Sequence, residues 1–243
     1  VLGFFIFVLK RKDLLIPKKE LLICAGLGVL GYAIFASLYF VAVEGVSIAL
    51  AALLLYTYPF WTALFNAVLG ERLRREQWAG LVGAAAGLIF LLWGQIEAQS
   101  LWAISAGILS AITYSLFVII SGRTLREVSS YGSGFWIISF ATLGLAILHR
   151  PDFSMASSWP LSTWGILFAI ALIGTVIPLV LIQASLQKLT STETALLCML
   201  EPVTAALAGM LWLNEALSLR QIVGAVLVLG SLWLTQKPNS STL

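Results

Sequence analysis

Long apolar runs constrain this sequence more than any other feature. They lie, to within about 2–4 residues at each end, at residues 21–43, 46–69, 76–95, 101–122, 131–149, 163–187, 191–213 and 218–236. A transmembrane helix needs about 20 apolar residues to cross roughly 30 Å of hydrocarbon, and each run is long enough. Several runs also lack the polar alternation of a membrane β-barrel. The sequence therefore predicts an all-α integral membrane protein with eight full spans.

Composition supports the same conclusion and excludes several classes of function. Only 10% of the residues are charged and 60% are hydrophobic, whereas a soluble domain usually carries about a quarter charged residues. Cys24 and Cys198 lie inside apolar runs, which favours small core residues over a disulfide. The single histidine, His149, offers no His-rich metal constellation. No P-loop, zinc, haem or nucleophile signature is present, so we expect neither a cofactor nor an enzyme.

The chain opens at Val1 without a methionine, in a short apolar stretch at residues 1–9. This stretch is too short to cross the hydrocarbon region. We interpret it as the end of a ninth span, which predicts an N-terminally truncated chain.

Lysine and arginine are distributed unevenly between alternate loops. Only Arg150 and Arg220 fall on one side of the predicted spans, and the other 12 of the 14 basic residues fall on the opposite side. Cytoplasmic loops attract Lys and Arg, so we predict a multi-pass protein of the cell inner (plasma) membrane with a cytoplasmic C-terminus. The net charge of +3 then reflects orientation among membrane lipids, and no nucleic-acid partner is expected.

The sequence contains a weak internal repeat. Residues 69–73 (LGERL) resemble residues 213–217 (LNEAL), and further matches follow at an offset of 143 or 144. The matching pairs are Gly31 with Gly174, Pro59 with Pro202, Gln77 with Gln221, and Gly80 with Gly224. Since the two copies of the LxExL segment fall on opposite sides of the predicted membrane, the halves are expected to be inverted. We place them at residues 1–97 and 98–243. Inverted repeats are typical of secondary transporters, which work by alternating access.

The paired motifs resemble those of the EamA-type drug/metabolite transporters. The matching pieces are Tyr58-Pro59, Gly70-Glu71, Gln77 to Gly80, Glu201-Pro202, Asn214-Glu215 and Gln221 to Gly224. The resemblance covers nearly the whole chain. It implies an inverted-repeat bundle of five plus five helices, of which one helix and most of a second are missing here. It also implies efflux or exchange of amino acids or other small metabolites.

Glu201 is the sharpest candidate for a functional side chain. It lies near the middle of the run at 191–213, where an ionisable group costs at least about 2.5–3.5 kcal/mol unless it is paired or hydrated. Pro202 beside it removes a backbone donor from the helix. Glu201 either binds a cationic substrate group or exchanges a proton, or it is protonated and hydrogen-bonds a neighbouring helix.

Aromatic and polar side chains in other spans are the remaining candidates. Tyr58, Tyr114, Trp61 and Gln183 supply the aromatic surface and the hydrogen-bonding groups that a small-molecule cavity needs. The alternative for each of them is ordinary packing or an interfacial position.

Two alternatives concern cargo and assembly. Anionic substrates require Lys or Arg within the spans, yet the basic residues lie in loops or at span ends. We therefore expect a neutral, zwitterionic or cationic small molecule; a sugar-phosphate or nucleotide-sugar exchanger is the second choice, followed by a membrane-embedded protein that transports nothing. Gly83 and Gly87 form a GxxxG pattern that packs helices within one chain or between two, which leaves a homodimer open.

Overall fold

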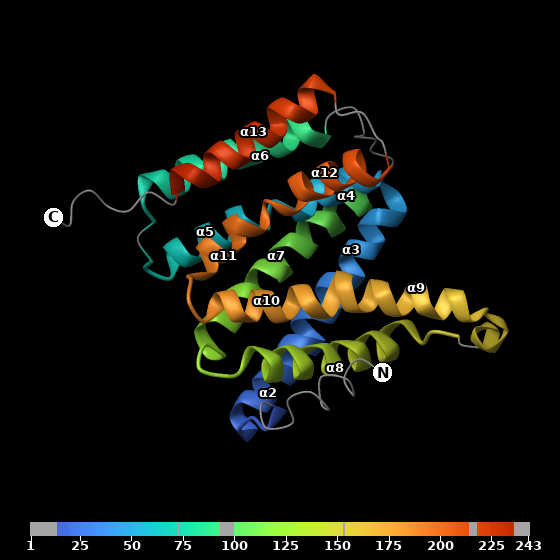
Figure 1. The fold of residues 1–243 in the computed structure, drawn as a ribbon. Coiled ribbons are helices and arrows are strands. Elements are labelled where there is room, and N and C mark those ends of the chain that lie inside the picture. The colour runs from blue at the N-terminus through green and yellow to red at the C-terminus, as the bar shows by residue number, and fades with distance from the viewer. Residues whose placement is uncertain (1–13, 72, 93–99, 153, 214–217, 236–243) are drawn as a thin grey trace. The chain divides into compact units, whose positions relative to one another are not determined.

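The computed structural model describes residues 14–71, 73–92, 100–152, 154–213 and 218–235. These residues form helices and short connections, and no strand occurs among them. The helical elements in chain order are α2 (Lys18–Gly26), η2 (Leu27–Ala33), α3 (Ile34–Gly45), α4 (Ile48–Leu55), α5 (Tyr58–Val68), α6 (Arg75–Leu92), α7 (Leu101–Thr124), α8 (Ser130–His149), η3 (Ser154–Ser158), α9 (Leu161–Ala171), η4 (Leu172–Val176), α10 (Ile177–Leu186), α11 (Ser191–Cys198), α12 (Glu201–Leu213) and α13 (Leu219–Thr235) (Figure 1).

The predicted spans correspond to these helices. Among the described residues, six stretches are long and apolar enough to cross a membrane: Lys18–Gly45, Ile48–Val68, Leu101–Thr124, Ser130–His149, Leu161–Leu186 and Ser191–Trp212. The other two predicted runs form α6 and the shorter apolar helix α13. The prediction of an all-α membrane bundle is confirmed, while the partial span predicted at residues 1–9 lies outside the described residues.

The chain divides into two compact units, each of which takes segments from both halves of the sequence. Unit 1 contains residues 1–37 and 116–191, and unit 2 contains residues 38–115 and 192–243. The predicted boundary between the repeats, at residue 97, divides the chain along the sequence, whereas each compact unit contains residues from both sides of that boundary. The repeat boundary stays a prediction.

Unit 1 is built around the close approach of η2 to α8. Gly28 makes this approach possible, because a Cβ atom there would lie 2.6 Å from the carbonyl oxygen of Ile137 and 2.9 Å from the backbone nitrogen of Ala141. From the α8 side, Gly144 faces Ala33 and Val29. Small residues let membrane helices pack this closely, and their van der Waals contacts stabilise the pair.

In unit 2, α6 and α13 run antiparallel, side by side (Figure 1). Gly87 meets Gly224 backbone to backbone: a Cβ on either residue would lie 2.6–2.7 Å from the other's carbonyl oxygen. Gly83 faces Ser231. The GxxxG pattern of α6 therefore packs against a helix of the same chain. Because α6 and α13 carry corresponding parts of the repeat, their antiparallel course is what inverted halves require.

The glutamines shared by the two repeats cap these helices. The Gln77 side-chain oxygen accepts from the backbone N–H of Arg74 at 2.9 Å. The Gln221 side-chain oxygen accepts in the same way from Ser218 at 2.8 Å, and the Ser218 hydroxyl accepts from the Gln221 N–H. At Ser218 and Gln221 these are the reciprocal bonds of a capping box. The Gln-x-x-Gly motif is thus structural: the glutamine begins the helix and the glycine allows close packing.

Candidate functional site

Two spans of unit 2 are interrupted at corresponding places. The first breaks at Tyr56-Thr57, between α4 and α5, and the second at Met199-Leu200, between α11 and α12. A proline is the second residue after each break, and it cannot donate the helical hydrogen bond to the residue four positions earlier. Broken helices within a membrane are tolerated where protein or water surrounds the freed backbone, and in transporters they commonly form the substrate site.

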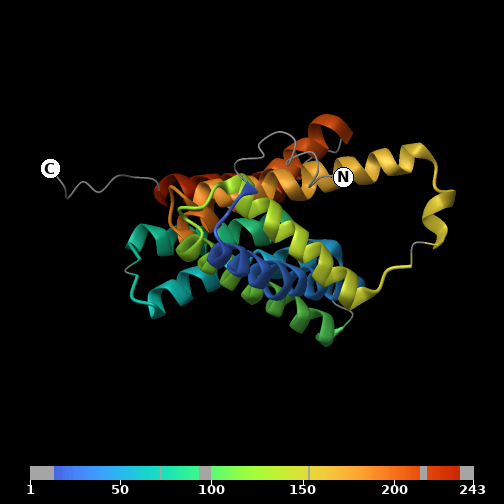
Figure 2. The same ribbon diagram turned by 90° about the horizontal axis from the view of Figure 1, so that it is seen from below.

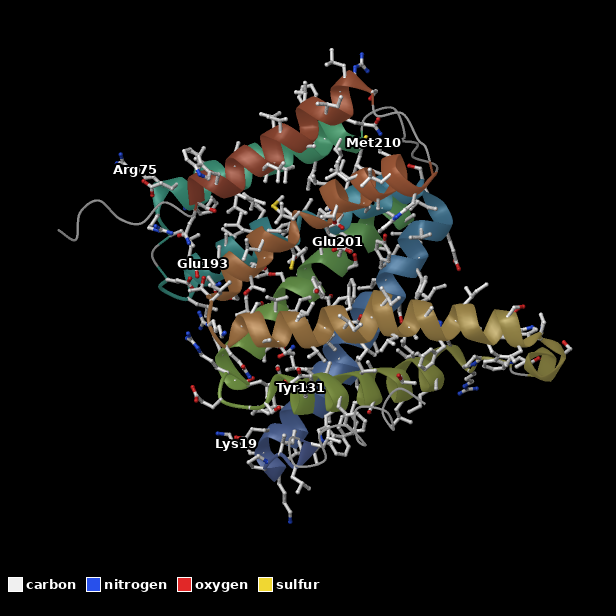
Figure 3. All side chains as sticks on the ribbon, viewed as in Figure 1. Lys19, Arg75, Tyr131, Glu193, Glu201 and Met210 are labelled. Atoms are coloured by element: carbon white, nitrogen blue, oxygen red, sulfur yellow. The ribbon has the colours of Figure 1, made fainter. Side chains whose placement is uncertain are left out.

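Glu201 is the first residue of α12 (Figure 3). Its side chain is exposed, which is unusual for a carboxylate in the middle of an apolar span. It makes a side-chain hydrogen bond with Tyr56 and interacts electrostatically with Tyr39 and Cys198. A negative charge is also favourable in the first turn of a helix. The carboxylate is therefore held in place but keeps accessible surface for another partner.

Aromatic side chains pack directly beside this carboxylate. Tyr58 is only 3% exposed and packs edge-to-face on Tyr114, with ring centroids 4.8 Å apart. Its hydroxyl donates to the Ala195 carbonyl at 3.4 Å and also contacts the Cys198 thiol. Tyr56, Trp61, Tyr114 and Cys198, all partly buried, surround Tyr58. We call these five residues the aromatic cluster.

A polar stripe runs along α5 away from the aromatic cluster. Tyr58, Thr62 and Asn66 are spaced four residues apart, so they share one face of the helix. The Thr62 hydroxyl is hydrogen-bonded to the Ser115 hydroxyl at 3.1 Å, and the Asn66 amide donates to the Thr192 hydroxyl at 3.0 Å. All four of the paired side chains are fully buried or nearly so. These bonds tie α5 to α7 and to the start of α11.

Four of the five predicted site residues lie in one neighbourhood of unit 2. Tyr58, Tyr114 and Trp61 belong to the aromatic cluster, and Glu201 is joined to it through Tyr56. Gln183 belongs to unit 1, where it is 3% exposed and its amide lies 3.5 Å from the Ser121 hydroxyl. The structure assigns a position to each of the five, and their roles in binding remain predictions.

Several residues that complete the site were not among the predicted site residues. Tyr56 is the hydrogen-bond partner of Glu201 and Tyr39 lies near it, but nothing in the apolar pattern distinguishes them from other tyrosines. The polar stripe had a usable signal, since Thr62 and Asn66 follow Tyr58 at the spacing of a helix face. Cys198, interpreted as a small core residue, is only partly buried and contacts Tyr58.

A carboxylate beside tyrosine rings is chemically suited to bind a cation. The carboxylate supplies the opposite charge, and aromatic faces attract an ammonium group by about 0.5–2 kcal/mol. The described residues contain no group of three or more His, Cys, Asp or Glu side chains that could hold a metal ion.

Comparison with known proteins identifies the family. The model of the EamA-like transporter family matches residues 1–93 and 101–236. An uncharacterized transporter of Archaeoglobus fulgidus is 29% identical over 217 residues, which cover 88% of this chain and 74% of the relative. The pseudopaline exporter CntI of Pseudomonas aeruginosa is 29% identical, covering 83% and 70%. The threonine/homoserine exporter RhtA of Escherichia coli is 25% identical, covering 78% and 63%.

The fold of this chain is similar to that of a solved crystal structure. It matches with a TM-score of 0.78 at 22% identity and covers 96% of this chain and 82% of the other. The family match extends over both halves of the sequence, and the apolar helices account for a multi-pass membrane protein. The chain therefore belongs to the EamA-like transporter family, and it is a membrane transporter rather than an enzyme.

Proposed function

We propose that this transporter exports or exchanges a small metabolite with an ammonium group, and that Glu201 binds that group. The observation that carries the proposal is the exposed carboxylate at a broken membrane helix, hydrogen-bonded to Tyr56 beside the aromatic cluster. An ammonium group would pair with the carboxylate and lie against tyrosine faces. The expected cargo is an amino acid, an amine or a similar zwitterionic or cationic solute.

Two further observations support this choice of cargo. The basic residues among those that the structure describes lie in loops or near the ends of the helical spans, so these spans offer little positive charge for a phosphate group. One relative is named as an exporter of threonine and homoserine, both of which carry an ammonium group at neutral pH.

The proposed mechanism is alternating access between two conformations of the inverted halves. No energy-supplying motif occurs in the sequence, so the driving force would come from a solute or ion gradient. The loop charges favour the plasma membrane orientation in which the C-terminus is cytoplasmic. This orientation is testable by labelling a cysteine placed after Thr235 from either side of the membrane.

The substrate class is tested by ligand-induced thermal stabilisation of the purified full-length protein. The panel contains L-threonine, L-homoserine, a diamine and glucose 6-phosphate. A ligand at about one hundred times its Kd stabilises the folded state by about 2.7 kcal/mol, which raises the unfolding temperature measurably. We expect an ammonium compound to stabilise the parent protein and glucose 6-phosphate to have no effect.

Glu201→Gln is measured in parallel, with Glu44→Gln as the matched control because Glu44 is an exposed glutamate of the same unit, at the end of α3. Stabilisation should vanish in Glu201→Gln and persist in Glu44→Gln. Equal stabilisation in both variants would show that Glu201 does not bind the ligand. Stabilisation by the sugar phosphate alone would overturn the proposed substrate class.

A further inference from the structure

Unit 1 contains two π-helical turns at corresponding places in the repeat. The first, η2, covers Leu27–Ala33, and the second, η4, covers Leu172–Val176. Each contains the glycine of a matched pair, Gly31 in the first half and Gly174 in the second. Helical turns of this width are rare, and they occur frequently at functional sites. A matched pair of them suggests a shared purpose.

Packing explains the glycines of the first turn. A Cβ atom on Gly28 would collide with the backbone of α8, and a Cβ atom on Gly31 would lie 3.2 Å from the ring of Phe117. Phe117 is itself only 1% exposed and has little room to move. The wide turn in η2 is therefore enclosed by α8 and by Phe117 of α7.

Packing does not explain the glycine of the second turn. No described atom lies within 4 Å of the position that a Cβ on Gly174 would occupy, and its backbone φ is outside the left-handed region. An alanine would fit there without strain. What glycine supplies at this position is conformational freedom, because it restricts the backbone less than any other residue.

A nearby proline accounts for only part of the wide turn. In a regular α-helix the ring of Pro178 would clash with the carbonyl of Gly174, and the wider turn relieves that clash. The Ile177 N–H accordingly reaches back five residues to Leu172. The corresponding residue of the first half is Phe35, however, and η2 is π-helical without a proline. The glycine, rather than the proline, is common to both turns.

The winding of η4 decides which way α10 faces. The elements α9, η4 and α10 run on as one continuous helix (Figure 2). Returning one π turn to α-helical winding shifts the register by one residue, which rotates the following helix by about 100°. Such a rotation would carry Gln183 away from its present position, where it is buried beside Ser121.

We propose that the π-helical turn at Gly174 is a hinge whose change of winding rotates α10, and with it Gln183, during the transport cycle. Gly174 is then a positioning residue that acts through Gln183. The inference rests on the proposed transport function. It adds a conformational change of η4, a segment in which packing does not require the glycine.

The test is Gly174→Ala in the full-length protein, with Gly165→Ala as the matched control. Gly165 lies in α9 of the same span, in regular α-helix, and no described atom lies within 4 Å of its Cβ position either. Both variants should keep the parent's unfolding temperature or exceed it. The probe is radiolabelled L-threonine, with exchange measured in proteoliposomes. We expect kcat to fall at least tenfold in Gly174→Ala, with KM within twofold of the parent, and no change in Gly165→Ala.

Amide hydrogen exchange provides a readout that does not depend on the substrate. Residues 172–177 should exchange faster than residues 163–169 in the parent, because opening of the wide turn exposes their amides. Gly174→Ala should slow the exchange of residues 172–177, and Gly165→Ala should not affect it.

The two readouts separate failure of the hinge from failure of the proposed function. A parental kcat in Gly174→Ala, or an equal fall in both variants, would overturn the hinge. If the parent neither binds nor transports threonine or any other ammonium compound of the ligand panel, the proposed substrate class is in error. Hydrogen exchange then decides alone: equal rates for residues 172–177 in the parent and in Gly174→Ala would overturn the proposal, and slower exchange in the variant would support it.

Discussion

The two broken spans of unit 2 have matching backbones and different chemistry. The helices α4 and α11 correspond at an offset of 143, from Ile48–Leu55 to Ser191–Cys198, and the following helices begin at Tyr58 and Glu201 at the same offset. Tyr58 is 3% exposed and packs among other side chains, whereas Glu201 is exposed. The repeat therefore duplicated the interruption but not the group placed at it.

This difference indicates different roles for the two broken spans. The first broken span is tied to its neighbours by the aromatic cluster and by the polar stripe from Tyr58 to Asn66. The second presents a carboxylate that keeps accessible surface. One interruption is thus suited to holding the site together, and the other to contacting a ligand. Substitutions in the two halves test that division.

The largest effect is expected from exchanging the two residues. Tyr58→Glu places a carboxylate at a position that is only 3% exposed, which should lower the free energy of unfolding by about 3–5 kcal/mol. Glu201→Tyr removes the hydrogen bond with Tyr56 at an exposed position and should lower the free energy of unfolding by only about 1 kcal/mol. Thermal unfolding of the purified variants measures both. Equal stability of the two variants would contradict the division.

A smaller loss is expected from Asn66→Ala. The variant removes the donor to the Thr192 hydroxyl and leaves a buried polar group unpaired, which costs about 1–3 kcal/mol. Val68→Ala is the control, because Val68 lies on the same helix and is 79% exposed. Unfolding temperatures should fall for Asn66→Ala only. Similar losses in both variants would mean that the polar stripe contributes nothing specific.

Tyr56→Phe should weaken ligand binding without unfolding the protein. The ring and its packing are kept, but the hydrogen bond to Glu201 is lost. A net loss of about 1 kcal/mol raises the Kd roughly fivefold, as measured by titration with the ammonium compound found in the ligand panel. Tyr58→Phe should behave oppositely, with a lower unfolding temperature and an unchanged Kd. A reversal of these two outcomes would refute the assignment of ligand contact to the second half.

The smallest effects are expected at the glutamine caps, where both halves place a glutamine side chain at the start of a helix. Gln77→Ala removes the acceptor of the Arg74 N–H, and Gln221→Ala removes the acceptor of the Ser218 N–H and hydroxyl. Each change should cost about 0.5–1 kcal/mol. The loss at Gln77 should be the larger, because Gln77 is only 6% exposed. Unfolding temperatures of the two variants measure the loss. Transport by both variants should be unchanged. A loss of transport in a stable Gln221→Ala protein would show that the motif is more than structural.

The spans and the two proline-associated breaks were predictable because their causes are local. Hydropathy marks each span, since lipid acts as the solvent along its whole length. Pro59 and Pro202 interrupt a helix wherever they stand. The same reasoning singled out Glu201, because a carboxylate in an apolar span is costly in any fold.

The partners of these residues were not predictable in the same way. That Tyr56 is hydrogen-bonded to Glu201 and Asn66 to Thr192 depends on how segments distant in sequence meet. The GxxxG pattern of α6 left packing within one chain or between two chains open, and only the antiparallel contact with α13 decided between them. Hydropathy likewise carries no signal for the π turns, because an apolar residue suits lipid in either winding.

The sequence by itself determined the membrane class, the spans, the repeat and the candidate carboxylate. These features depend on the identity of single residues: each side chain is apolar or polar toward hydrocarbon, and each proline lacks a backbone N–H donor. Only the tertiary structure decided which tyrosine is hydrogen-bonded to Glu201, which glycines are enclosed by packing, and that Gly174 is not among them. Those features depend on van der Waals contacts and hydrogen bonds between helices far apart in the chain, and such contacts leave no periodic pattern in a sequence that is apolar almost throughout.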